Sequence, residues 1–150
     1  MAHVSEVVGK YSELAVRMAL MANGWTVSKT ETDEAYDLIG EDPLNGRTYK
    51  FQVKTILHRP DRKSYVIQSK NGQGEAYTKA QAHYIAGVLA TDGEIPRVFY
   101  FENTGQKEYW SIEATAAKRW IELPIALDRS TLTEQNGSRT EANKTEKAAI

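Results

Sequence analysis

The chain of 150 residues contains no cysteine, which excludes disulfide bonds and thiolate metal sites. Redox chemistry therefore leaves the compartment open, with the cytoplasm as the default expectation. The three histidines do not have the spacing of zinc ligands, so no zinc site is expected. No apolar run is long enough for a membrane span, and no signal-peptide pattern opens the chain. A P-loop, a dinucleotide-binding fingerprint and a Gly-x-Ser-x-Gly elbow are also missing.

The residues that are present suit a single folded domain. A chain of this length builds one hydrophobic core but is short for two ordinary domains. Its hydrophobic share of 41% is typical of a soluble globular protein. From Asp128 onward Ser, Thr, Glu, Asn and Lys dominate. We therefore expect a folded domain over 1–127 and a polar C-terminal tail over 128–150, weakly packed alone and able to order on DNA or at a subunit contact.

The charge is unevenly distributed along the chain. A net charge of −1 argues by itself against a nucleic-acid-binding protein. However, 29–46 carries six acidic residues against one basic residue, whereas 47–79 carries eight basic residues against two acidic ones. A local excess of positive charge beside carboxylates is what an enzyme acting on phosphodiesters requires. The alternative is a solvated surface with uneven charge.

Hydrophobic periodicity and turn residues predict an α/β order of elements. A helix capped by Ser5 is expected to run to Ala22 and to end at Asn23-Gly24. Its predicted core face is the stripe Val4, Val8, Tyr11, Ala15, Met18 and Ala22. Strands are expected over 25–30, 36–39, 48–57, 64–68, 86–91, 98–102 and 108–112, and short helices over 77–82 and 113–120.

Three polar residues from two of these strands form a candidate site. Alternation along the strand expected over 48–57 sends Phe51 and Val53 to one face, and Gln52 and Lys54 to the other. Asp37 lies before a turn that leads back into this strand, so a hairpin can place it beside Gln52 and Lys54. Such a group would hold a divalent cation and a water against a phosphate. The alternative is that Gln52 and Lys54 occupy the solvated side of an edge strand.

Glu13 is the candidate that the N-terminal helix contributes. It lies opposite the predicted core face, on the line of Gly9, Val16 and Leu20. Gly9 leaves space beside the carboxylate, while the two aliphatic residues indicate that this side is partly covered. A carboxylate in such surroundings has a cationic partner or binds a metal. The alternative is a surface glutamate paired with Arg17.

The segments Gly9-x-x-x-Glu13, Tyr36-Asp37-Leu38 and Phe51-Gln52-Val53-Lys54-Thr55 resemble, in this order, the motif of the PD-(D/E)XK nuclease superfamily. The resemblance covers roughly 5–112. Within the superfamily the chain is similar to archaeal Holliday-junction resolvases and to cyanobacterial group I intron homing endonucleases, which share the Q-x-K form. It departs from the motif where Tyr36 replaces proline and Gln52 replaces an acid. The implied fold is a restriction-endonuclease-like mixed sheet flanked by helices.

The resemblance also implies a role for each site residue. Glu13, Asp37, the amide oxygen of Gln52 and the backbone carbonyl of Val53 would bind Mg²⁺ or Mn²⁺, which prefer hard oxygen ligands. Lys54 would activate the attacking water or stabilise the developing charge on the phosphate. Catalysis is thus expected from Glu13, Asp37, Gln52 and Lys54. Because Gln52 removes a negative charge from the site, a catalytically inactive DNA-binding protein with the same fold remains an alternative.

The function that follows from the resemblance is site-specific, metal-dependent hydrolysis of double-stranded DNA by a homing endonuclease. A Holliday-junction resolvase and an RNA-cleaving enzyme remain alternatives. One small chain covers little DNA, so a homodimer or homotetramer is expected. Cationic side chains beside the site are candidates for phosphate contacts, and amides for contacts to base edges. These candidate DNA-binding residues are His58, Arg59, Arg62, Lys63, Gln68, Lys70, Asn71, Gln73 and Lys79.

Overall fold

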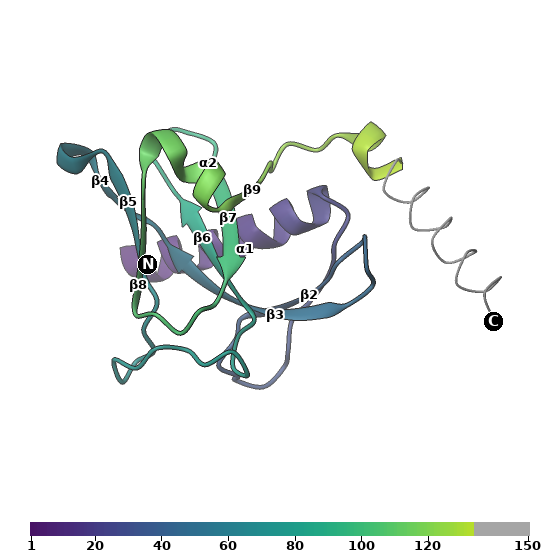
Figure 1. Ribbon diagram of the computed structural model, residues 1–150, viewed down its shortest axis with the longest axis horizontal. Helices are drawn as coiled ribbons and strands as arrows, with labels where there is room; N and C mark the ends of the chain where they lie inside the picture. The colour runs from purple at the N-terminus through teal and green to yellow at the C-terminus, as the bar shows by residue number, and fades with distance from the viewer. Residues whose placement is uncertain (134–150) are drawn as a thin grey trace.

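A long N-terminal helix packs on one face of a six-stranded mixed sheet, and a smaller three-stranded sheet covers the other face (Figure 1). The computed structural model describes residues 1–133. Its helices are α1 (Val4–Ala22) and α2 (Ala116–Arg119), with short 3₁₀ turns η1 (Pro60–Arg62) and η2 (Glu113–Thr115). Its strands are β1 (Thr26–Ser28), β2 (Leu38–Glu41), β3 (Thr48–Thr55), β4 (Leu57–Arg59), β5 (Ser64–Gln68), β6 (Tyr84–Leu89), β7 (Arg97–Glu102), β8 (Glu108–Ile112) and β9 (Ile121–Leu123).

The large sheet has the strand order β1-β2-β3-β6-β7-β9. Its neighbouring strands are antiparallel except for β3 and β6, which run parallel. A parallel pair needs a crossover connection, and here the crossover carries β4 and β5, which join β8 in the small sheet. The short helix α2 packs on the same side of the large sheet as the small sheet, through Ala116 and the following Trp120. The prediction of a mixed α/β fold, with a sheet flanked by helices, is confirmed.

The core on the α1 side corrects one prediction from the sequence. Val4, Tyr11 and Met18, expected in the core, are exposed, whereas Val16 and Leu20 are fully buried. The buried face of α1 comprises Ser12, Ala15, Val16, Ala19 and Leu20. Apolar residues surround most of this helix, so their periodicity alone does not select a face. On this face the Ser12 hydroxyl contacts β3 directly, 2.7 Å from the hydroxyl of Thr55.

The second core lies between the large sheet and the small one, and Gly87 of β6 lies at its tightest point. A Cβ atom at Gly87 would lie 2.5 Å from Cδ1 of Ile67 and 3.2 Å from Cγ1 of Ile56. Ile67 is fully buried and has little room to move.

The substitution Gly87→Ala is therefore expected to destabilise the protein by about 1–3 kcal/mol through overpacking. Denaturant unfolding measures this change. Adding Ile67→Val removes the clashing methyl, so the double variant is expected to be more stable than the two separate losses predict. If the losses of stability in Gly87→Ala and Ile67→Val simply add in the double variant, the proposed clash between the new Cβ atom and Ile67 is contradicted.

The ends of several elements differ from the prediction. The N-cap of α1 is His3, whose ring nitrogen accepts the N–H of Ser5, so Ser5 is not the cap. At the other end Gly24 has a φ of 87°, and the predicted stop at Asn23-Gly24 is confirmed. The single strand predicted over 48–57 is two strands, β3 and β4, separated by the buried Ile56.

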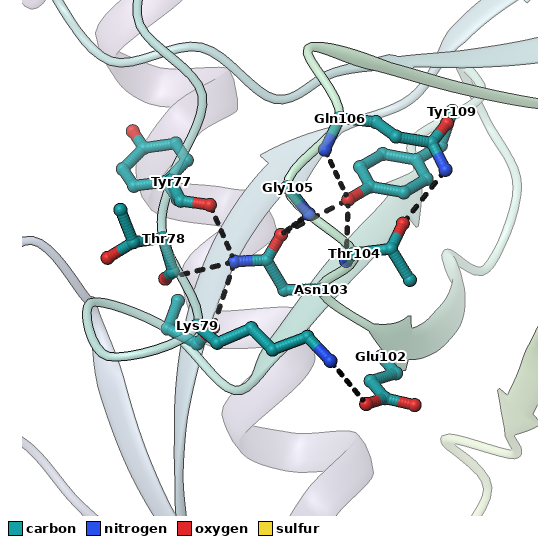
Figure 2. A network of polar contacts seen from close by, with 10 residues as sticks. Tyr77, Thr78, Lys79, Glu102, Asn103, Thr104, Gly105, Gln106 and Tyr109 are labelled. Atoms are coloured by element: carbon teal, nitrogen blue, oxygen red, sulfur yellow. Dashed lines mark hydrogen bonds and ion pairs between the residues drawn. The ribbon is translucent and has the colours of Figure 1, made fainter.

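The helix predicted over 77–82 is wrong, because this segment forms a looped turn bound to a buried asparagine (Figure 2). Nδ2 of Asn103 donates to the backbone carbonyls of Tyr77 at 2.9 Å, Thr78 at 3.2 Å and Ala82 at 2.9 Å. Oδ1 of Asn103 accepts the N–H of Gly105 and the hydroxyl of Tyr109. The side chain of Asn103 thus satisfies carbonyl groups of a segment that lies 21 to 26 residues earlier in the chain, and it fixes the loop against the end of β7.

None of the helices within residues 1–133 is long and apolar enough to cross a membrane. The predicted polar tail over 128–150 lies outside the described residues from 134 onward.

Candidate functional site

Asp37 is held at the point where β2 ends its pairing with β3. It directly precedes β2, and its backbone N–H donates to the carbonyl of Phe51 at 2.8 Å. Its Oδ2 accepts the N–H of Val53 at 2.8 Å. Since β2 pairs with β3 only as far as Phe51, the edge of β3 beyond this point is open toward Asp37. The hairpin predicted from the sequence therefore does place Asp37 beside this strand.

One hollow of about 300 Å³ collects the polar residues of this region. Glu13 of α1, Asp37, and Gln52, Val53 and Lys54 of β3 line it. Gly9, Ser12 and Thr55 complete its wall. All four residues predicted to be catalytic thus come from three separate segments to one place. The backbone carbonyl expected as a ligand belongs to the same wall.

Glu13 has a cationic partner that sequence reasoning missed. Nζ of Lys29 lies 2.6 Å from Oε1 of Glu13, and Nζ of Lys10 lies 3.8 Å from Oε2. The Glu13 side chain is only 13% exposed. The anticipated alternative partner was Arg17, but the close ion pair is with Lys29, which directly follows β1. No signal in the sequence marked Lys29, because its proximity to Glu13 depends on how β1 packs beside α1.

Gln52 is buried rather than solvated, with 8% of its surface exposed. Its Nε2 donates to the carbonyl of Val53 at 3.3 Å. The alternative that Gln52 occupies a solvated strand face is therefore wrong. A half-turn of the amide group would present the Oε1 atom in place of Nε2, so the same position can donate to the Val53 carbonyl or supply a neutral oxygen ligand.

Lys54 is fixed by the loop that follows β5. Its Nζ donates to the backbone carbonyl of Lys70 at 3.0 Å and lies 5.1 Å from the ring centroid of Tyr77. The Tyr77 hydroxyl donates to the same carbonyl at 3.4 Å. The ammonium group is therefore held beside the hollow by a carbonyl and an aromatic face, with no carboxylate as its partner in these contacts.

The pKa of the Asp37 carboxyl is raised above its ordinary value of 3.8. Burial is the largest cause, and the charge of Glu13 adds to it. The hydrogen bond from Val53 and the charges of Lys54 and Lys29 act in the opposite direction without cancelling the effect. In the metal-free protein, ionised Asp37 therefore opposes folding.

This shift predicts how the stability of the metal-free protein depends on pH. Well below pH 3.8 Asp37 is protonated in both folded and unfolded chains and has no effect. As the pH rises from 3.8 through the raised pKa, the unfolded chain ionises first and the folded state loses stability. Asp37→Asn is therefore expected to gain stability over the wild type across this window and to keep the gain at neutral pH. Thermal unfolding in EDTA measures the gain.

Asn at this position keeps an oxygen that can accept the Val53 N–H. Asp33→Asn, at an exposed position in the preceding loop, is the matched control and is expected to show no such gain. A wild-type protein that stays as stable as Asp37→Asn throughout the window would contradict the burial argument.

The candidate DNA-binding residues fall into two groups. His58, Arg59, Arg62 and Lys63 lie on β4, η1 and the turn into β5. His58 contacts the carboxylate of Glu113, and Arg59 and Arg62 line a second hollow together with the half-exposed ring of Trp110.

The second group occupies the end of β5 and the loop after it. The carbonyl of Lys70 binds Lys54, so this loop adjoins the candidate site. Oδ1 of Asn71 accepts the N–H groups of Gln73 and Glu75 within the loop. Lys79 pairs with Glu102 at 3.2 Å, and Gln68 and Gln73 are exposed. The cationic side chains of both groups therefore lie at or near the surface.

The hollow offers oxygen atoms of the kind that Mg²⁺ and Mn²⁺ prefer. Within residues 1–133 no three His, Cys, Asp or Glu side chains gather as a metal cluster. The carboxylates that line the hollow are those of Glu13 and Asp37. The Gln52 amide and the Val53 carbonyl add two neutral oxygens. Burial and the charge of Glu13 disfavour the ionised form of Asp37, and a divalent cation would relieve both effects. The residues present therefore fit such a cation, provided that Lys29 releases Glu13.

Comparison with known proteins adds one finding about the architecture. No protein-family model and no curated protein sequence matches the chain. A solved structure, that of the bacterial homing endonuclease I-Ssp6803I, is similar with a TM-score of 0.58 and 20% sequence identity. The similarity covers 74% of this chain and 80% of that one. The chain therefore shares its mixed α/β fold with a bacterial homing endonuclease.

Proposed function

We propose that the protein is a metal-dependent DNA endonuclease of the PD-(D/E)XK type that cuts double-stranded DNA at a specific site, as a homing endonuclease does. The observation that carries the proposal is the convergence of Glu13, Asp37, Gln52 and Lys54 on one hollow at the open edge of β3. The similarity in fold to a homing endonuclease supports it.

Each residue of the hollow has a defined task in this proposal. Glu13, Asp37, the Gln52 amide oxygen and the Val53 carbonyl hold Mg²⁺ or Mn²⁺. When bound, the metal lowers the pKa of water and neutralises phosphate charge. Lys54, held by the Lys70 carbonyl and the Tyr77 ring, orients the attacking water or stabilises charge on the phosphate.

Lys29 keeps Glu13 in place before the metal binds. The ion pair between them offsets the cost of a carboxylate that is mostly shielded from solvent. A divalent cation would take over this role, and the freed ammonium group of Lys29 would then be available to a DNA phosphate.

The DNA would lie against the cationic side chains of the turn between β4 and β5 and of the loop after β5. Arg59, Arg62, Lys63, Lys70 and Lys79 would contact phosphates, and His58 would join them once free of Glu113. Gln68, Asn71 and Gln73 would contact base edges.

The direct test is cleavage by the purified chain under defined metal conditions. Linear duplex, supercoiled plasmid, a four-way junction and RNA are incubated with Mg²⁺, Mn²⁺ or EDTA. The proposal expects duplex DNA to be nicked or cut at discrete positions with Mg²⁺ or Mn²⁺ and to stay intact with EDTA. Cleavage confined to the junction would instead identify a resolvase, and cleavage confined to RNA an RNA-cleaving enzyme.

The neutral Gln52 favours a second candidate, a DNA-binding protein that has lost cleavage. Gln52 is buried beside only two carboxylates, one of them already paired with Lys29. Tight binding to duplex DNA without any cut, across several divalent ions, would favour this inactive protein over the enzyme.

A further inference from the structure

The side of α1 that faces away from the sheet carries a continuous apolar stripe. Six large side chains occupy it at alternating separations of three and four residues. They are between 44% and 75% exposed. We name this stripe the outer α1 seam; it consists of Val4, Val7, Tyr11, Leu14, Met18 and Met21.

The outer α1 seam differs from the scattered exposed apolar residues that every soluble protein has. Its members repeat as the a and d positions of a heptad over almost the whole length of α1, which is the pattern of a helix that packs against another helix. Beside it lies a mainly apolar hollow of about 570 Å³, bounded by Leu14 and Met18 on α1 and by Ile95, Pro96 and Ile125. Ile95 is itself 79% exposed. The apolar surface therefore extends beyond the helix.

We propose that the outer α1 seam binds the same seam of a second copy of this chain, with the two helices antiparallel. A seam paired with itself about a two-fold axis offers each apolar side chain an apolar counterpart. In this arrangement Val7 lies opposite Met18 of the second copy, and Tyr11 lies opposite Leu14. Burying both seams and the adjoining hollow removes roughly 1,000 Å² of surface in total, about the minimum area that a biological interface buries.

Charges beside the seam distinguish the antiparallel from the parallel orientation. Glu6 and Arg17 lie on the same flank of α1, near opposite ends of the helix, with Lys10 between them. Two antiparallel helices related by a two-fold axis place this flank against itself, so Arg17 of each copy comes level with Glu6 and Lys10 of the other. Two parallel helices would place it against the opposite flank, which carries Val8 and Ala15, and no pair between Glu6 and Arg17 would form.

The remaining residues of the chain do not offer an equivalent partner for the seam. The sequence from 134 to 150 contains one large aliphatic residue, Ile150, and no aromatic residue. One such side chain cannot cover six. A second copy supplies all six in the correct spacing.

The association is measured on the full chain without DNA or metal, so its outcome is independent of the proposed cleavage. Sedimentation over about 1–100 μM is expected to show twice the monomer mass or an even multiple of it. Leu14→Glu and, separately, Tyr11→Lys are expected to weaken the association at least about 100-fold, because each places a charge in the apolar seam. Circular dichroism verifies that both variants remain folded. Leu44→Glu, at a side chain 67% exposed outside the seam, is the matched control and is expected to leave the mass unchanged.

Charge exchange and cross-linking test the orientation. Glu6→Arg is expected to weaken the association, and the double variant Glu6→Arg/Arg17→Glu is expected to restore it. Because the chain has no cysteine, Val7→Cys/Met18→Cys is expected to form an intermolecular disulfide on oxidation, whereas Val7→Cys alone is not. A monomer at all concentrations, or an association that Leu14→Glu and Tyr11→Lys leave intact, would overturn the proposed interface. Cross-linking by Val7→Cys alone would overturn the antiparallel arrangement.

Discussion

Replacing Asp37 by asparagine is expected to lower metal-dependent DNA cleavage by about 100- to 1,000-fold or more, the loss typical of removing a group that stabilises the reaction electrostatically. The variant keeps the side-chain oxygen that accepts the Val53 N–H, so the local fold is retained. It loses one of only two carboxylates in the hollow and thus half of the negative charge that would attract the metal. Cleavage of duplex DNA over a range of Mg²⁺ concentrations measures the change.

Two further measurements separate lost chemistry from lost folding. Without metal, Asp37→Asn is expected to be more stable than the wild type, because its buried charge is gone. With saturating Mg²⁺ the wild type is expected to gain thermal stability, as any protein does when a ligand binds its folded state, and the variant to gain less. Asp33→Asn provides the matched control in the cleavage assay as well. Wild-type cleavage by Asp37→Asn would remove Asp37 from the proposed site.

The part of the site that could be predicted from sequence rests on short-range geometry. Strand alternation fixes that Gln52 and Lys54 share a face, and a hairpin of few residues returns Asp37 to the same strand. The position of Glu13 required the motif resemblance as well, because nothing local connects α1 with β3. Their meeting in one hollow agrees with the prediction; their roles in catalysis remain a prediction.

The missed features depend on contacts between segments far apart in the sequence. Lys29 reaches Glu13 only because β1 lies beside α1 in the folded sheet. The choice of the buried face of α1 depends on which side meets β3, and a helix with apolar residues on both sides gives no local answer. The predicted core stripe included Ala15, which is buried, but also Val4, Tyr11 and Met18, which are exposed and belong to the outer α1 seam.

The segment over 77–82 failed as a helix for a similar reason. Its local sequence is compatible with a helix, and the Thr78 carbonyl accepts the N–H groups of Gln81 and Ala82 in a single turn. The turn goes no further, and the carbonyls of Tyr77 and Ala82 on either side of it accept from Asn103 instead. Asn103 is fully buried and thus competes in a place where water does not. The loop that results brings the Tyr77 ring to the ammonium group of Lys54, so an asparagine outside the hollow determines part of the hollow's surroundings.

Asn103→Asp is accordingly expected to destabilise the protein by about 2–4 kcal/mol, because it removes both N–H donors from three carbonyls and buries a carboxylate oxygen against them. Its size and its Oδ1 contacts with Gly105 and Tyr109 are otherwise preserved. For a chain of this length the loss corresponds to a fall in Tm of roughly 5–15 °C. Thermal unfolding at neutral pH measures it.

The same variant is expected to lower cleavage at a temperature where it is still folded, since the loop that positions Lys54 loses its attachment (Figure 2). Asn45→Asp, in the exposed turn between β2 and β3, provides the matched control and is expected to change Tm by less than about 2 °C, as surface substitutions usually do. The contrary result is that Asn103→Asp cleaves at the wild-type rate at lower temperature while hydrogen exchange shows that its 77–82 loop still opens. That result would show that the position of Lys54 does not depend on this loop. An unchanged Tm for Asn103→Asp would show that the loop carbonyls find other donors, and the account of why 77–82 is not a helix would then be wrong.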